Sequence, residues 1–211
     1  GRDAPRDGRP LPLSFAQQRL WFIAQMDPVA SAAYHMPAAL RLTGKLDRSV
    51  LQAALDRVMA RQEGLRVRFV TADGVPHQVM APADVGFVLT EKDLSHLAHA
   101  ERERTVAAEA AESASAPFDL ATGPLIRGRL LHLSQEEHVL LISQHHLVSD
   151  GWSVGVMVRE VATLYAAFST GKADPLPALE FQYADYAAWQ RQWLQGEELE
   201  RQIDFWRGHL L

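Results

Sequence analysis

Cysteine is absent from the 211 residues of this chain. Its absence excludes disulfide bonds and thiolate metal sites, and it suits a reducing compartment, so we expect a cytoplasmic protein. Long apolar runs are also absent, since none approaches the roughly 18 residues that a membrane span requires. The net charge is only −5. This balance gives no electrostatic reason to expect a nucleic-acid partner or binding to an anionic membrane.

Two common catalytic motifs are missing as well. The sequence has no H-E-x-x-H frame around its histidines, so we predict no metal site. It has no G-x-S-x-G elbow, which argues against a serine hydrolase. The opening stretch GRDAPRDGRP is polar and rich in proline and glycine, and we predict a linker over residues 1–10.

The rest of the chain predicts helices and strands in mixed order. Hydrophobic residues make up 47% and charged residues 22%, as in an ordinary globular domain. Three local signals are strong: Ser14 and Asp47 as helix N-caps, and Asp73-Gly74 as a hairpin turn. The expected elements are a helix from Ser14 to about Met26, a short strand around Leu40 and Leu42, a helix after Asp47, a hairpin over residues 65–80, a strand within 85–94, a helix within 97–115, strands within 124–133 and 138–144, and a helix capped by Ser153.

This order predicts an α/β (α+β) sandwich in which helices pack on a mixed sheet. We assign residues 11–170 to one lobe. Residues 171–177, with Gly171, Pro175 and Pro177 close together, are expected to form a linker. Tryptophan-rich helices are expected over 178–211. They pack either on this lobe or on a partner surface.

The stretch QHHLVSDGWS, residues 144–153, places two histidines and an aspartate where an apolar strand ends. Imidazole exchanges a proton near neutral pH. Adjacent strand residues point to opposite faces, so we expect one histidine of the pair to be structural and the other to be available for chemistry. A histidine pair near a core strand is more often structural than catalytic, so spacing alone indicates no more than a general base in a cleft.

Five stretches resemble condensation domains of non-ribosomal peptide synthetases: four match successive motifs in the family's order, and PFDLATGPLIR is a further family-like stretch. QHHLVSDGWS matches the H-H-x-x-x-D-G signature at every signature position, while RQEGLRVRF, similar to the second motif, has Gln62 where histidine is more usual. The five are LSFAQQRLWF over 13–22, RQEGLRVRF over 61–69, QHHLVSDGWS over 144–153, PFDLATGPLIR over 117–127 and YADYAAW over 183–189.

The resemblance implies one of two lobes, each similar to chloramphenicol acetyltransferase. Family members place the active site between these lobes. The later motifs, including one similar to G-x-F-V-N-T, do not occur here. The chain is therefore expected to cover the N-terminal lobe and the helices leading toward the C-terminal lobe, and to be inactive alone.

The family pattern also implies roles for individual residues. His146 is the expected catalytic residue, and His145 a structural one. Asp150 is expected to fix the loop through an arginine, either Arg61 or Arg66. In the remaining signature positions Gly151 is expected near the thioester oxygen, Trp152 as a wall of the site, and Ser153 at a helix start.

The implied reaction is amide formation between two thioesters carried on 4′-phosphopantetheine arms, with no cofactor bound to the chain itself. Expected partners are donor and acceptor peptidyl carrier proteins, adjacent synthetase domains and the C-terminal lobe. Two alternatives remain. One is a docking or recruitment module without catalysis, and the other is a single-lobe acyltransferase that completes its site by trimerising.

Overall fold

The computed structural model describes residues 10–27, 35–146 and 151–176. The helices predicted over 178–211 and nearly all of the predicted linker over 1–10 lie outside these ranges. Within them no helix combines the length and the apolar character needed to cross a membrane.

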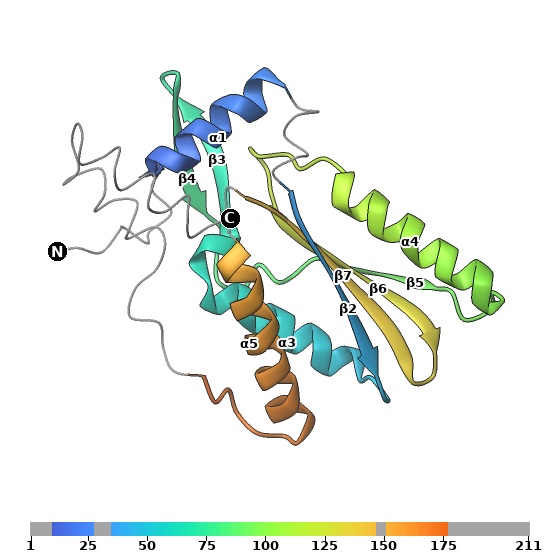
Figure 1. The fold of residues 1–211 in the computed structure, drawn as a ribbon. Coiled ribbons are helices and arrows are strands. Elements are labelled where there is room, and N and C mark those ends of the chain that lie inside the picture. The colour runs from blue at the N-terminus through green and yellow to red at the C-terminus, as the bar shows by residue number, and fades with distance from the viewer. Residues whose placement is uncertain (1–9, 28–34, 147–150, 177–211) are drawn as a thin grey trace.

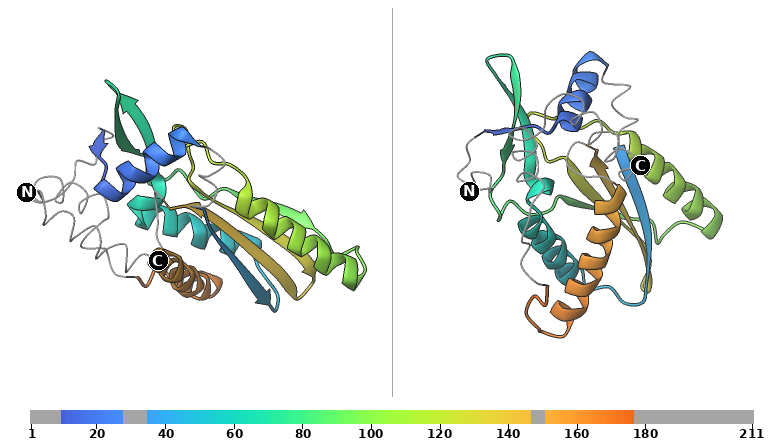
Figure 2. Two further views of the ribbon diagram at one scale, coloured as in Figure 1. Left: turned by 45° about the horizontal axis from the view of Figure 1, so that its top comes forward. Right: turned by 60° about the vertical axis from the view of Figure 1, so that its left-hand side comes forward.

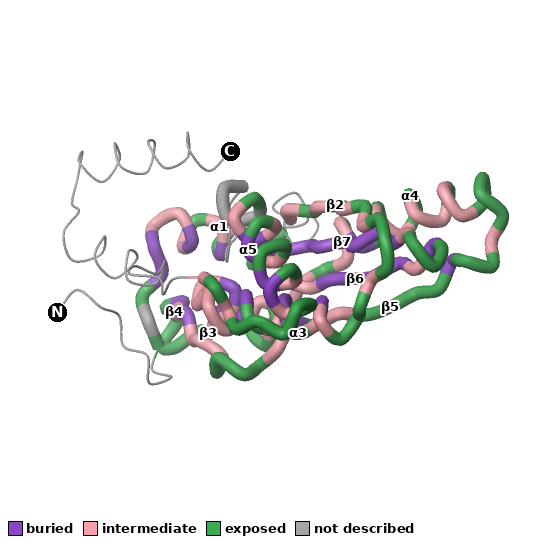
Figure 3. Tube along the Cα trace, turned by 90° about the horizontal axis from the view of Figure 1, so that it is seen from below, coloured by how far each residue is buried: buried purple, intermediate pink, exposed green. Residues whose placement is uncertain are grey.

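The largest unit is a four-stranded mixed sheet in the order β2-β7-β6-β5 (Figure 1). Strands β2 (His35–Thr43), β7 (Glu137–His145) and β6 (Ile126–Ser134) are antiparallel, whereas β5 (Leu89–Asp93) runs parallel to β6. Every residue of β7 after Glu137 is buried (Figure 3). A strand buried on both faces carries a continuous apolar run rather than an alternating pattern, and this explains the run VLLI over residues 139–142.

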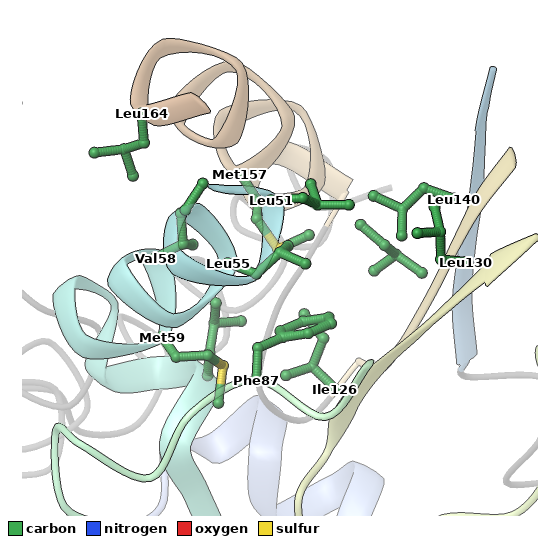
Figure 4. Close-up of a cluster of buried hydrophobic side chains, with 13 residues drawn as sticks. Leu51, Leu55, Val58, Met59, Phe87, Ile126, Leu130, Leu140, Met157 and Leu164 are labelled. Atoms are coloured by element: carbon green, nitrogen blue, oxygen red, sulfur yellow. The ribbon is translucent and has the colours of Figure 1, made fainter. Parts of the chain in front are cut away.

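Helices cover both faces of this sheet (Figure 2). Helices α3 (Arg48–Arg61) and α5 (Gly151–Ser169) pack on one face, and α4 (His99–Ser115) packs on the other. The α3 and α5 side holds the main core (Figure 4), whose residues include Leu51, Leu55, Val58, Met59, Phe87, Ile126, Leu130, Leu140, Met157 and Leu164. The sandwich predicted from the order of elements is confirmed.

A second sheet of three strands, in the order β1-β4-β3, lies beside the first. It consists of β1 (Leu11–Pro12) and the hairpin of β3 (Val67–Ala72) and β4 (Val75–Met80). Asp73 and Gly74 have φ values of 53° and 76°, the left-handed geometry that a two-residue hairpin turn requires. Helix α1 (Phe15–Met26) packs on this sheet through Trp21.

The predicted starts of α1 and α3 are confirmed. The Ser14 hydroxyl accepts from the Gln17 amide and the Gln17 side chain accepts from the Ser14 amide, a complete capping box. Asp47 caps α3 by accepting from two amides of its first turn. The buried residues of α3 recur at the spacing of one helical face, namely Leu51, Ala54, Leu55, Val58 and Met59.

Three predicted boundaries were wrong. Ser153 does not cap α5, because that helix begins at Gly151 and Ser153 lies inside it. The sequence has an aspartate directly before Gly151, a residue type that favours the N-cap position as strongly as serine does. Arg66 belongs to the short 3-10 helix η2 (Glu63–Arg66) rather than to the hairpin. Strand β2 is longer than expected because all nine of its residues pair with β7.

Alanine substitutions at two glycines should change the free energy of unfolding in opposite directions. A Cβ at Gly128 in β6 would lie 2.7 Å from a ring carbon of the buried Phe87, whereas a Cβ at Gly155 in α5 would have nothing within 4 Å. Gly128→Ala should lower the free energy of unfolding by about 1–3 kcal/mol through overpacking. Gly155→Ala should raise it by up to about 1 kcal/mol, because alanine favours the helix. Urea denaturation of both variants checks this, and equal effects would contradict it.

Candidate active site

His145 is the last residue of β7 and is 1% exposed. Its amide donates to the carbonyl of Leu125 at 2.9 Å, and it pairs with His35, the first residue of β2. The centroid of the His35 ring lies 5.4 Å from that of His145 and 4.9 Å from that of Phe118, both in edge-on geometry. The three rings form a cluster, here called the strand-end cluster, that packs the end of the central strand.

Burial keeps this cluster uncharged at neutral pH. Burial, together with the nearby His35 and His146, lowers the pKa of His145 to about 4. The pKa of His35 is also lowered, mainly by burial and in part by the charge of Arg127, although its bond to the Ala114 carbonyl opposes the shift. His35 Nδ1 lies 2.9 Å from the Ala114 oxygen near the end of α4. The first histidine of the pair is thus held inside the lobe.

Arg127 packs on the Phe118 ring of the strand-end cluster. Its guanidinium lies 3.9 Å from the centroid of the Phe118 ring, in cation–π geometry. It also donates to the carbonyl of Pro117 at 3.0 Å and to the carbonyl of Ala116. The stretch over 117–127 resembles a family motif, but no role was predicted for its residues. The sequence signal that could have pointed to Phe118 and Arg127 is that both lie in one family-like stretch.

His146 follows β7 directly, lies in a turn and is half-buried. Asp150 lies outside the described residues. Gly151 is the first residue of α5, and Trp152 and Ser153 follow it in that helix. The structure therefore brings the second histidine and the start of a long helix to the same end of the sheet, with the signature aspartate in the connection between them.

The two arginines predicted as partners of Asp150 have different surroundings. Each nitrogen of the Arg66 guanidinium donates to a backbone carbonyl, those of Met59 at 2.8 Å, Ala60 at 3.3 Å and Ala81 at 2.7 Å. Arg66 thus closes the carboxyl end of α3, where orphan carbonyls favour a cation. Arg61 instead donates from Nε to the carboxylate of Glu160 on α5 at 2.9 Å.

A groove of about 440 Å³ opens beside the strand-end cluster. Its lining comes from α1, the start of β2, β3 and the loop after α4, and it includes Trp21, Phe69, His35 and Phe118 but not His146. Among the described residues no group of three or more histidine, aspartate or glutamate side chains is arranged to hold a metal ion.

A mixed sheet with helices on both faces, and a histidine pair where its central strand ends, defines a lobe of the chloramphenicol acetyltransferase type. A family model described as the condensation domain matches residues 9–211. The chain belongs to the condensation domain family.

Relatives named as peptide synthetases are similar over nearly the whole chain. Malpibaldin synthetase of Mortierella alpina is 46% identical over 96% of this chain, which spans 4% of that protein. Malpinin synthetase of the same organism is 48% identical over 93% of this chain, which spans 2% of that protein. The chain thus corresponds to a small part of each of these relatives.

Solved structures show the same lobe within larger domains. The X-domain from teicoplanin biosynthesis is 32% identical, with a TM-score of 0.80 over 99% of this chain and 45% of that chain. The first condensation domain of the calcium-dependent antibiotic synthetase, solved with a substrate analogue, is 26% identical with a TM-score of 0.74. That comparison covers 95% of this chain and 48% of the other chain.

Proposed function

We propose that this chain is the N-terminal lobe of a condensation domain that forms amide bonds in a non-ribosomal peptide synthetase. One observation carries the proposal: an unbroken H-H-x-x-x-D-G signature joins the end of the buried strand β7 to the start of α5, within a chain that belongs to the condensation domain family. The reaction joins a donor aminoacyl or peptidyl thioester to the amine of an acceptor aminoacyl thioester.

The reaction requires little general-base catalysis from the protein. The α-amine of the acceptor attacks the thioester carbonyl of the donor, a C–N bond forms, and the C–S bond breaks to release the donor arm as a thiol. An α-amine has a pKa near 7.7–8.0 and is partly neutral at pH 7. In this proposal His146 holds the amine in line and accepts the proton that leaves nitrogen as the tetrahedral intermediate forms.

His145 serves as a structural residue in the same proposal. Its depressed pKa keeps it neutral, and its packing against His35 and Phe118 fixes the end of β7. Because His146 is the next residue, this cluster also fixes the backbone from which the catalytic imidazole projects. Support by a rigid packed neighbour is what a catalytic group needs for accurate placement.

Arg61 is the favoured partner of Asp150. Arg66 has each guanidinium nitrogen bonded to a carbonyl of its own neighbourhood, which leaves it poorly placed to bind a carboxylate elsewhere. Arg61 is bonded through Nε to α5, the helix that follows Asp150 in sequence. An arginine at this position can pin the loop by a charge-assisted bidentate contact.

The start of α5 supplies the rest of the site in this proposal. Backbone amides in the first turn of a helix are unpaired and carry a partial positive charge. Gly151 presents its backbone near the thioester oxygen, and Trp152 forms a wall. Ser153 lies one position beyond Trp152 in the same first turn, so its amide contributes to this positive helix end.

The lobe needs partners to function. It spans less than half of the solved relatives, so the proposed cleft requires a C-terminal lobe as its second wall, and the isolated lobe should be inactive. Donor and acceptor peptidyl carrier proteins would deliver substrates on 4′-phosphopantetheine arms, alongside adjacent synthetase domains. The cysteine-free sequence agrees with a cytoplasmic enzyme.

A docking module is a second candidate, favoured by one observation. A structure of the X-domain from teicoplanin biosynthesis in complex with OxyB matches this chain with 33% identity and a TM-score of 0.77. A lobe of this fold can therefore belong to a protein-binding domain. In such a role the chain would bind a carrier protein or another partner without catalysis.

The test extends the chain through its second lobe and supplies loaded donor and acceptor carriers. We expect mass spectrometry to detect the amide on the acceptor arm with the extended chain, and none with the 211-residue lobe alone. Carrier binding without any amide would instead support the docking module. A lobe that is active alone as a stable trimer would support a single-lobe acyltransferase.

A further inference from the structure

The loop between α4 and β6 holds His145 at the end of the central strand β7. Its Leu125 carbonyl accepts from the His145 amide at 2.9 Å, and the centroid of its Phe118 ring lies 6.2 Å from that of His145, in edge-on geometry. His145 is 1% exposed, so it cannot move without displacing these neighbours. The loop therefore fixes both the backbone and the ring of His145.

The two ends of this loop meet at Arg127, the second residue of β6. Leu125 precedes Arg127 by two positions. The Arg127 guanidinium donates to carbonyls at the other end of the loop, those of Pro117 at 3.0 Å, Ser113 at 3.5 Å and Ala116. Carbonyls at the end of a helix favour a cation, and the last turn of α4 contains no basic residue of its own. Arg127 therefore holds the end of α4 against the start of β6.

The same guanidinium packs on the face of Phe118. Its central carbon lies 3.9 Å from the ring centroid, in cation–π geometry. Nη1 and Nη2 both donate to carbonyls, so the guanidinium plane cannot turn without breaking hydrogen bonds, and the ring packed on it keeps one orientation. Phe118 lies edge-on to His145 and to His35, which also lie edge-on to each other. Arg127 therefore acts on His145 through Phe118.

We propose that Arg127 is a positioning residue of the condensation reaction. It keeps Phe118 packed on His145, and thereby fixes the end of β7, from which the adjacent His146 projects. The inference rests on the proposed function, in which His146 holds the attacking amine and accepts its proton. Arg127 contacts no reacting atom in this role. A displacement of about 1 Å at a reaction centre can slow the reaction about 100-fold, so a residue outside the site can control kcat.

The chain offers a matched control in Arg102. This partly buried arginine near the start of α4 donates to the carbonyl of Leu133 in β6 at 3.4 Å. It also joins α4 to β6, but it lies about 18 Å along the helix from Ala114, the residue that His35 contacts. Arg102→Met therefore removes a contact of the same kind without altering the strand-end cluster.

The activity test uses the chain extended through its second lobe, with loaded donor and acceptor carriers. Arg127→Met should lower kcat for amide formation by about 10- to 100-fold and leave KM for the carriers within about twofold, because the site geometry changes and the carrier-binding surfaces do not. Arg127→Lys keeps the charge over the ring but lacks the forked bonds, so it should recover part of kcat. Arg102→Met should leave kcat unchanged.

A double-mutant cycle tests the route through Phe118. Phe118→Leu should also lower kcat, because it removes the ring on which Arg127 packs and which lies against His145. Phe118→Leu combined with Arg127→Met should lower kcat little more than the larger single change does, since both break the same chain of contacts. Losses that multiply would show that the two residues act independently, and would overturn the inference.

The pKa of His35 supplies a readout that is independent of activity. Burial lowers this pKa most, and the charge of Arg127 lowers it further. In an NMR titration of the 211-residue chain, Arg127→Met should therefore raise the pKa of His35 while leaving it below 6.5, and Arg102→Met should not change it. The His35→Gln variant assigns the signal. An unchanged pKa in Arg127→Met would show that the guanidinium does not act on the cluster.

If Arg127→Met does not fold, Arg127→Lys and Phe118→Leu test the same contacts. The inference is overturned if the Arg127 variants keep full kcat, if Arg102→Met loses as much, or if the pKa of His35 does not change in Arg127→Met. An absence of amide from the unaltered extended chain overturns the proposed function, and this role of Arg127 with it. Amide from the unaltered chain and from the Arg127 variants at the same rate overturns the positioning role alone.

Discussion

Replacing His146 with alanine in the extended chain should slow amide formation by about 10²–10⁴-fold, the usual contribution of a general acid–base group. The physical reason is that the nitrogen of the acceptor amine becomes positively charged as it attacks, and its proton needs an acceptor within hydrogen-bond reach. His146 is half-buried in the turn after β7, so its imidazole is not enclosed as that of His145 is. Single-turnover formation of the acceptor-bound amide, followed by mass spectrometry, measures the loss.

The size of the loss separates two roles for His146. A loss within the stated range indicates proton acceptance, while a loss of about tenfold or less indicates that the imidazole only holds the amine in line. His99→Ala is the matched control, because His99 is an exposed histidine at the first position of α4. If both variants form amide at the unaltered rate, His146 has no essential role in the chemistry.

Acidification should destabilise the folded lobe through His145. Burial lowers the pKa of this histidine to about 4, while an exposed histidine has a pKa of 6.5. Between these pH values the unfolded chain binds a proton that the folded chain does not, so the free energy of unfolding falls as the pH decreases from about 6.5 to about 4. At about 1.36 kcal/mol per pKa unit, His145 alone accounts for up to about 3 kcal/mol.

Urea denaturation between about pH 7 and pH 4 tests this prediction on the 211-residue chain. His145→Gln should be less stable than the unaltered chain at neutral pH, and the difference should shrink by up to about 3 kcal/mol toward pH 4. The pKa values of His35 and His138 are also lowered, mainly by burial, so a part of the pH dependence should survive in the variant. His99→Gln, at an exposed site, should keep the full dependence. Parallel curves for the unaltered chain and His145→Gln would contradict the prediction.

The sequence was sufficient for features that depend on near neighbours. The N-caps at Ser14 and Asp47 involve hydrogen bonds to residues two or three positions away, and the turn at Asp73-Gly74 is set by those two residues. The buried face of α3 follows from helical periodicity alone. The signature over 144–153 also needed no structure, because its residues are adjacent in the chain.

Ambiguous local signals explain the boundaries that failed. Aspartate and serine are equally good N-caps, so the pattern around 150–153 allowed two helix starts. Arg66 fits the alternation of a strand, but its guanidinium bonds the last carbonyls of α3 and keeps residues 63–66 in a 3-10 turn. Side-chain bonds to backbone across a few residues can override a periodic pattern.

The family, the order of the elements and the signature histidines could all be predicted before any fold was known, because each depends on residues that are close together in the chain. The partners of the buried polar groups could not be predicted from the sequence. In the structure His35 lies beside His145, Arg127 lies over Phe118, and Glu160 lies against Arg61. His35 and His145 are far apart in the sequence, and Arg61 and Glu160 are separated by 99 positions. Such pairs form because strand register and helix packing bury them together, and no local pattern in either segment specifies the other.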